Sequence, residues 1–145
     1  MYKHLLLPTD GSTISAAAIQ TSITFAKGIN AKVTGITVTP EYQVFTYQTE
    51  MLEDTRQKFA KDSKAHASQY LAVIEEAAKA AGVACEIIHV VSNHPHEAII
   101  KTAKEKGCDL ITMASHGRAG VPALLIGSET QKVLAHSRIP VLVFR

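Results

Sequence analysis

The stretch DLITMASHGRAGVPALLIGSETQKV, residues 109–133, joins the signals of a strand, a glycine-containing loop and a helix. The apolar run over 108–114 predicts a strand, and the pattern over 128–136 predicts a helix. Ser128 with Gln131 three residues later fits a capping box at the start of that helix. A strand that leads through a loop into a helix is the repeating unit of parallel α/β folds.

The same alternation continues in both directions along the chain. Strands are expected at Tyr2–Pro8, Ala31–Thr39, Val83–Val91, Cys108–Ala114 and Pro140–Phe144; helices at Ser12–Lys27, Thr49–Ala81, Pro95–Lys106 and Ser128–His136. Such alternation produces parallel strands joined by right-handed crossovers. We therefore predict an α/β fold, an open five-stranded parallel sheet with helices on both faces, as one domain over residues 1–145.

The helix expected over Thr49–Ala81 is unusually long, and Gly82 is its stop signal. Its inner stripe is predicted to contain Leu52, Thr55, Phe59, Tyr70, Val73, Ile74 and Ala77. His66 is assigned to the same side, as an interior or interface residue.

Composition narrows the class of protein. Of 145 residues, 46% are apolar and 19% charged, which is typical of a soluble globular domain, and no apolar run is long enough to cross a bilayer. Pro8, Thr9 and Asp10 interrupt the N-terminal apolar run before it resembles a signal peptide, so a cytoplasmic location and no membrane insertion are expected. The net charge of +2 is scattered, which argues against a nucleic-acid surface. Cys85 and Cys108 have neither disulfide nor zinc spacing.

Ligands of open parallel sheets bind beyond the carboxyl ends of the strands, where the strand order reverses. Gly117 and Gly127 would let a phosphate approach the backbone, and Ser128 opens a helix whose first amides lack partners. The alternative is that these residues are ordinary loop punctuation and a helix cap. Neither of the common phosphate-loop patterns, GxxxxGK[ST] or GxGxxG, is present.

The chain resembles the universal stress protein family over essentially its whole length. The nucleotide-binding members of that family carry G-x2-G-x9-G-[ST] after the fourth strand. Gly117, Gly127 and Ser128 match this motif, and Ala114 occupies the place of its first glycine. The resemblance implies a Rossmann-like fold, similar to adenine nucleotide alpha hydrolases, with strand order 3-2-1-4-5. Some members lack the glycines and bind no ATP, and Ala114 leaves that alternative open.

The resemblance also implies roles for individual residues in binding ATP or another adenine nucleotide. These roles fall on Pro8, Thr9, Asp10, Val38, Met113, Ala114, Gly117, Arg118, Gly127, Ser128 and Glu129. The main-chain N–H groups of the last three and of Gly117 would line the triphosphate, and Met113 and Ala114 would lie against the ribose and phosphates. The turn after the first strand would approach the adenosine, and the Val38 backbone would read the adenine edge. Asp10 would help to hold Mg or Mn on the phosphates.

Several of these positions have plainer interpretations. Asp10 precedes Gly11 and fits an ordinary turn, while His116 and Arg118 either face the phosphates or are solvated. The loop 42–47, with Tyr42 and Tyr47, forms either a lid or a patch against a partner. His94 and His96 need a third ligand before they make a metal site.

The last strand leaves an unpaired sheet edge, so we predict a homodimer through Val141 and Val143, and the resemblance implies the same arrangement. The predicted function is a nucleotide-binding stress-response signalling module rather than an enzyme, because no catalytic triad or dyad is visible. The alternative is an interaction module that binds no nucleotide. A phosphoacceptor receiver domain would require a cluster of acidic residues, of which only Asp10 is present.

Overall fold

The computed structural model describes residues 1–43, 49–116 and 126–145, without the side chains of 49–53. The strands are β1 His4–Pro8, β2 Lys32–Thr39, β3 Cys85–Val91, β4 Leu110–Ala114 and β5 Val141–Phe144. The helices are α1 Thr13–Gly28, α2 Thr49–Ala81, α3 Pro95–Lys106 and α4 Ser128–His136. The predicted order of elements is confirmed, and the bounds of α2 and α4 match residue for residue.

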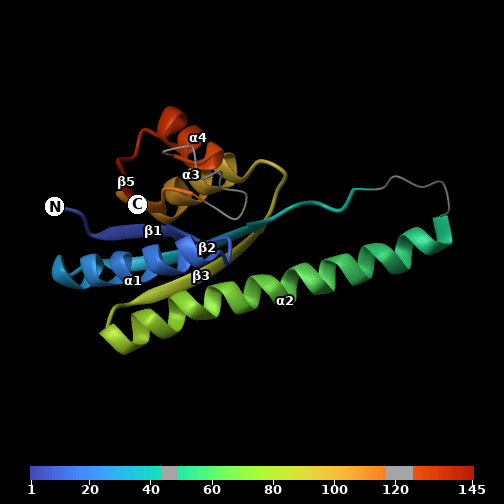
Figure 1. Cartoon of the computed structure of the whole chain (residues 1–145), viewed down its shortest axis with the longest axis horizontal. Coiled ribbons are helices and arrows are strands. Elements are labelled where there is room, and N and C mark those ends of the chain that lie inside the picture. Colours follow the sequence, from blue (N-terminus) through green and yellow to red (C-terminus); the bar gives the residue numbers. More distant parts are fainter. Residues whose placement is uncertain (44–48, 117–125) are drawn as a thin grey trace.

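The five strands form one parallel sheet in the order β3-β2-β1-β4-β5, which confirms the predicted fold class and strand order. Helices α1 and α2 cover one face of the sheet, and α3 and α4 cover the other (Figure 1). The strand order reverses between β1 and β4, because β2 lies on one side of β1 and β4 on the other.

Two apolar cores lie on opposite faces of the sheet, and β1 contributes to both. Leu5 and Leu7 pack with residues of α1 and α2, whereas Leu6, between them, packs with Ile99 of α3 and Val133 of α4. All five of these side chains are at most 4% exposed. A central strand with both faces covered therefore appears in the sequence as a continuous apolar run.

Local signals set the ends of the shorter helices. The Ser12 hydroxyl accepts a hydrogen bond from the Ser15 N–H at 3.2 Å and caps α1. Pro95 is the first residue of α3, where its missing N–H costs nothing, and Gly107 ends α3 with a φ of 72°. The left-handed residue after α1 is Asn30 rather than Gly28, which belongs to the helix.

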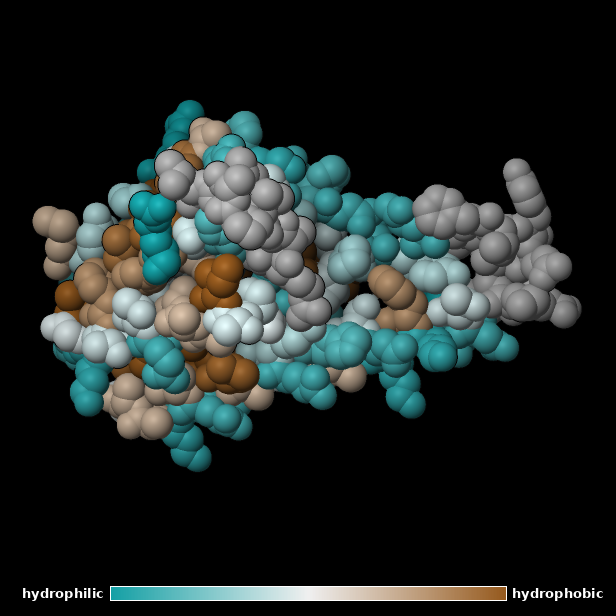
Figure 2. Space-filling model, viewed as in Figure 1, coloured by the Kyte–Doolittle hydropathy of each residue, from teal (hydrophilic) through white to brown (hydrophobic). Residues whose placement is uncertain are grey.

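Helix α2 extends well beyond the sheet (Figure 1). Among its described side chains, those from 54 on, the buried ones are Ala67, Leu71, Ile74 and Ala78, which lie in its C-terminal half and cover the core. The described side chains from 54 to 66 are exposed or half-buried, and Figure 2 shows this part of the surface as mostly hydrophilic.

The inner stripe predicted for α2 is therefore partly wrong. Ile74 is fully buried, but the neighbouring Val73 is 43% exposed. His66 is exposed rather than interior, and its ring stacks on Tyr70 with centroids 6.3 Å apart. Leu52 is outside the described side chains.

Two glycines allow α2 to approach the sheet closely. A Cβ built at Gly35 of β2 would lie 2.9 Å from Cδ1 of Ile74, and one at Gly11 would collide with the Tyr70 ring.

Among the described residues, no helix has the length and apolar character needed to span a membrane.

Candidate functional site

The candidate site lies at the carboxyl edge of the sheet, where β1 and β4 part. Their paired register ends at Leu6 and Ile111, although β1 continues to Pro8 and β4 to Ala114. On the other side, β1 stays paired with β2 as far as Pro8. The sheet therefore opens at the reversal of strand order, the place where such folds bind ligands.

The turn after β1 is held by hydrogen bonds of Thr9. Its N–H donates to the Ile36 carbonyl at 2.9 Å, and its carbonyl accepts from the Thr37 hydroxyl at 2.7 Å. The Thr9 hydroxyl accepts from Ser15 Oγ at 2.8 Å and from the Gly11 N–H at 3.2 Å. Thr9 is buried, so its side chain builds the turn and only its neighbours Pro8 and Asp10 are partly exposed.

Asp10 has the turn role that the sequence offered as one of two readings. Its Oδ1 accepts from the Ser12 N–H at 2.9 Å, two residues on, and Gly11 between them has a φ of 78°. This is the geometry of an Asx turn. It leaves the half-buried carboxylate at the carboxyl end of β1, beside the candidate site.

Val38 presents its backbone, rather than its side chain, toward the site. The Ile36 carbonyl points toward β1, and residues two apart in a strand point their peptide groups to the same side. The peptide groups of Val38 therefore face the space beyond Pro8, where β1 has ended. The Val38 side chain packs against the core beneath α3 and α4.

The start of α4 is tied to the end of β4 by two hydrogen bonds. The Gly127 N–H donates to the Ser115 carbonyl at 2.6 Å, and the Thr130 hydroxyl donates to the Ala114 carbonyl at 3.0 Å. The Ser115 N–H in turn donates to the Phe144 carbonyl of β5 at 2.7 Å. The first turn of α4 therefore has a fixed place at the carboxyl end of β4, one of the two strands that border the opening.

The capping box predicted at Ser128 is wrong. Gly127 is the cap residue, Ser128 is the first residue of the helix, and no side chain among the described residues caps it. The Gln131 N–H donates to the Gly127 carbonyl, and its side-chain amide donates to the Ile126 carbonyl. The exposed Ser128 hydroxyl is not used as a cap, and the Ser128 and Glu129 amides have no acceptor among the described residues. Free amides at a helix start attract an anion.

Of the remaining predicted site residues, Glu129 aside, Met113 and Ala114 are described by the structure and the others are not. The Met113 side chain is 6% exposed and belongs to the core beneath α3 and α4, so its main chain, rather than its side chain, is available to a ligand. Ala114 is half-buried at the end of β4. Gly117 and Arg118 lie outside the described residues, as do Tyr47 and the rest of 44–48.

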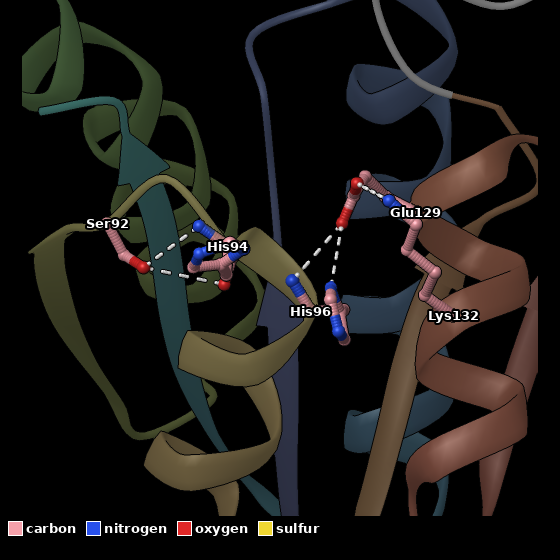
Figure 3. A network of polar contacts seen from close by, with 5 residues as sticks. All are labelled: Ser92, His94, His96, Glu129 and Lys132. Carbon is pink, nitrogen blue, oxygen red and sulfur yellow. Dashed lines mark hydrogen bonds and ion pairs between the residues drawn. The ribbon is translucent and has the colours of Figure 1, made fainter. Parts of the chain in front are cut away.

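Glu129 makes contacts that the sequence did not reveal. Its Oε2 accepts from the His96 N–H of α3 at 3.2 Å and lies 3.5 Å from His96 Nδ1 (Figure 3). Its Oε1 accepts from Lys132 Nζ at 3.1 Å. The His96 ring lies 5.6 Å from that of His136. Because His96 and Glu129 are 33 positions apart, a single sequence does not predict their contact.

Neither the histidines nor the cysteines form a metal centre. No three His, Cys, Asp or Glu side chains converge within the ranges that the structure describes. His94 instead donates its N–H to the Ser92 hydroxyl at 3.1 Å. Both cysteines are free, and burial raises the pKa of the Cys108 thiol to about 11, which makes it a poor nucleophile.

Two further side chains lie near the loops around the site. His116 follows β4, and its Nδ1 is 3.1 Å from the Ser115 hydroxyl. The Tyr42 ring packs on Phe59 of α2 at 5.5 Å, and the Arg56 guanidinium lies 6.0 Å from the Tyr42 ring centroid. Tyr42 therefore lies against the projecting part of α2.

The fold defines a doubly wound α/β protein whose helix α4 starts at the carboxyl end of β4, next to the reversal of strand order. The chain belongs to the universal stress protein family, whose sequence profile matches residues 1–145.

Three relatives illustrate the similarity. Universal stress protein YxiE of Bacillus subtilis is 31% identical over 149 aligned positions, which cover 100% of both chains. The solved structure of MJ0577, from Methanocaldococcus jannaschii, has a TM-score of 0.83 at 29% identity and covers 99% of this chain and 95% of its own. A universal stress protein solved in complex with cAMP has a TM-score of 0.67 at 25% identity, covering 99% of this chain and 96% of its own.

Proposed function

We propose that the protein binds ATP or another adenine nucleotide at the opening between β1 and β4. The main supporting observation is the start of α4, which has no side-chain cap among the described residues and is fixed to the end of β4, beside this opening, by the bond from Gly127 to Ser115. The relative in complex with cAMP supports an adenine nucleotide as the ligand class.

The proposed roles follow the fold. The N–H groups of Ser128 and Glu129 would hold phosphate oxygens, with the Ser128 hydroxyl as a further donor. The Val38 backbone would contact the base, and Pro8 to Asp10 would border the adenosine. Ala114, the main chain of Met113, Gly117 and Arg118 complete the proposed site.

Asp10 would hold Mg or Mn only together with the phosphates. One of its oxygens accepts from Ser12 within the turn, and no cluster of further protein ligands exists among the described side chains. Mg²⁺ often takes one or two carboxylates and completes its shell with phosphate oxygens and water. The Asp10 carboxylate fits that limited role.

We propose that binding serves a stress-response signal rather than catalysis, with residues 1–145 acting as one domain. The alternative is an interaction module that binds no nucleotide. It is favoured by Ala114, whose methyl group occupies the place of the first motif glycine.

Calorimetric titration of ATP into the wild type and into Gly127→Val tests the proposal. Gly127 has φ −67° and ψ 158°, a conformation that valine also adopts, so the helix start is expected to keep its backbone. The added side chain would stand before the first amides of α4. Loss of their bonds to a charged phosphate predicts binding about 10- to 100-fold weaker.

Gly28→Val is the matched control, because a Cβ at Gly28 meets nothing within 4 Å. It should bind ATP like the wild type. Thermal melting followed by circular dichroism checks that both variants fold, and Gly127→Ala serves if the valine variant melts early. Absence of ATP binding by the folded wild type would favour the interaction module. Equal ATP binding by the wild type and the Gly127 variant would mean that the nucleotide does not use the start of α4.

A further inference from the structure

The side chain of Glu129 turns from its own helix toward α3. Glu129 is the second residue of α4, whose first amides form the proposed phosphate site. Its Oε2 accepts from the His96 N–H at 3.2 Å, and its Oε1 accepts from Lys132 Nζ at 3.1 Å (Figure 3). Both oxygens are therefore engaged away from the amides that would receive a ligand.

Helix α3 needs the acceptor that Glu129 provides. Its cap residue, His94, makes no side-chain capping bond, and its first residue, Pro95, has no N–H. His96 therefore carries the first amide of α3. A carboxylate beside a helix N-terminus is also favoured by the helix dipole. The N-terminus of α3 thus binds the carboxylate of Glu129, which belongs to α4.

The His96 ring lies against the same carboxylate. Its Nδ1 is 3.5 Å from Glu129 Oε2, is buried, and has no hydrogen-bond partner among the described residues. His96 and His136 line one surface groove of about 470 Å³. The charged and titratable groups around His96 are Glu129, Lys132 and His136 of α4, with His94, Glu97 and Lys101 of its own segment.

We propose that Glu129 is a positioning residue for phosphate binding: its contact with α3 keeps the carboxylate off the first amides of α4, and a proton on His96 strengthens that contact. The inference rests on the proposed nucleotide function. It adds a regulation of the same site by protons.

The physical reason is competition between two anions. A carboxylate in the first turn of α4 is attracted to the amides that would hold phosphate, and it repels the phosphate itself. A neutral imidazole has one N–H, whereas the imidazolium of His96 has two and always offers Nδ1–H to Glu129. Its charge also offsets the carboxylate. ATP should therefore bind more tightly when His96 carries the proton.

The coupling between proton binding and ATP binding can be measured. If a proton on His96 favours ATP binding, ATP binding must favour the proton, so the complex takes up protons as it forms. Calorimetry at pH 6.5 in buffers of different ionisation enthalpy measures that uptake. His96→Gln should take up fewer protons than the wild type. Between pH 7.5 and 5.5 the wild type should gain about two- to fivefold more affinity than the variant, the effect of one charge near a helix end.

Glu129→Gln separates the charge from the contact. The glutamine keeps an oxygen to accept the His96 N–H but carries no charge. It should bind ATP more tightly than the wild type at pH 7.5 and show the proton uptake of His96→Gln. Glu76→Gln is the control, because it removes an exposed carboxylate of α2, on the face of the sheet opposite α3 and α4. It should behave like the wild type.

The outcomes distinguish the two proposals. Titration of the ATP γ-phosphate is common to all variants, so differences between variants belong to the protein. Equal proton uptake by the wild type, His96→Gln and Glu129→Gln would overturn the role of Glu129 while leaving nucleotide binding intact. Absence of ATP binding in every protein would overturn both. Melting curves verify folding, and Glu129→Gln alone decides the matter if His96→Gln is unstable.

Discussion

Gly11 links the turn at the candidate site to helix α2. Its φ of 78° disfavours any side chain, and the Tyr70 ring of α2 occupies the space of a Cβ. The Asp10–Gly11 pair predicted the turn from sequence alone. The Tyr70 ring above it depends on how α2 crosses the sheet, which no local pattern encodes.

Gly11→Ala should therefore cost more stability than Gly82→Ala. Gly82 has a similar φ of 73°, but a Cβ there meets nothing within 4 Å, so this substitution should cost only the left-handed penalty of about 1–2 kcal/mol. Overpacking against Tyr70 should add about 1–3 kcal/mol at Gly11. Urea unfolding of both variants measures the difference.

The Tyr70→Ala background provides the control. Without the ring, Gly11→Ala should cost no more than Gly82→Ala. If the cost of Gly11→Ala is the same in both backgrounds, the contact with Tyr70 has no energetic weight.

Ser128 and Glu129, in the first turn of α4, show the limit of local sequence motifs. Ser128 and Gln131 fit a capping box, yet the cap is Gly127, because Gln131 bonds to the carbonyls of Ile126 and Gly127 instead. Glu129 was predicted only through its main chain. Its side-chain role depends on the uncapped start of α3, which is adjacent in space and remote in sequence.

At the level of elements, α2 is longer than the sheet it covers. Its 33 residues span about 50 Å, whereas the eight residues of β2 span about 26 Å. Sequence signals fixed its ends through Gly82 and its helical period. They misplaced its inner face because the stripe was fitted along the whole helix, including the part with no sheet beneath it.

Ile74→Ala should cost about 2–5 kcal/mol, because Ile74 is fully buried against Gly35. Val73→Ala is the matched control: Val73 adjoins Ile74 but is 43% exposed, so its loss should cost less than about 1 kcal/mol. Thermal or chemical unfolding compares the two. A larger loss of stability at Val73 than at Ile74 would mean that Val73 faces the core, as the predicted inner stripe requires.

At the scale of the molecule, the sheet has two open edges, β3 and β5. The alternation of strands and helices predicted the parallel sheet, and the family resemblance supplied the order of strands. All four residues of β5 are half-buried in the single chain. We propose that two copies pair β5 strands about a twofold axis through Val141 and Val143, which would cover this edge.

Val143→Lys should weaken such a dimer at least about tenfold, because two buried ammonium groups would face each other across the axis. Sedimentation analysis over a range of concentrations measures the change. Ile87→Lys, on the edge strand β3 and 37% exposed, is the control and should leave the oligomeric state unchanged. Dissociation by Ile87→Lys alone would assign the interface to the opposite edge.

The hydrogen bond from Gly127 to Ser115 has a consequence for how the site can evolve. It joins Ser115, which follows β4, to Gly127, which precedes α4, at 2.6 Å. Lengthening a segment whose ends are already clasped costs little, about 0.6 kcal/mol for each doubling. Changes in the length of this segment should therefore be tolerated while the scaffold beside the proposed site stays unchanged.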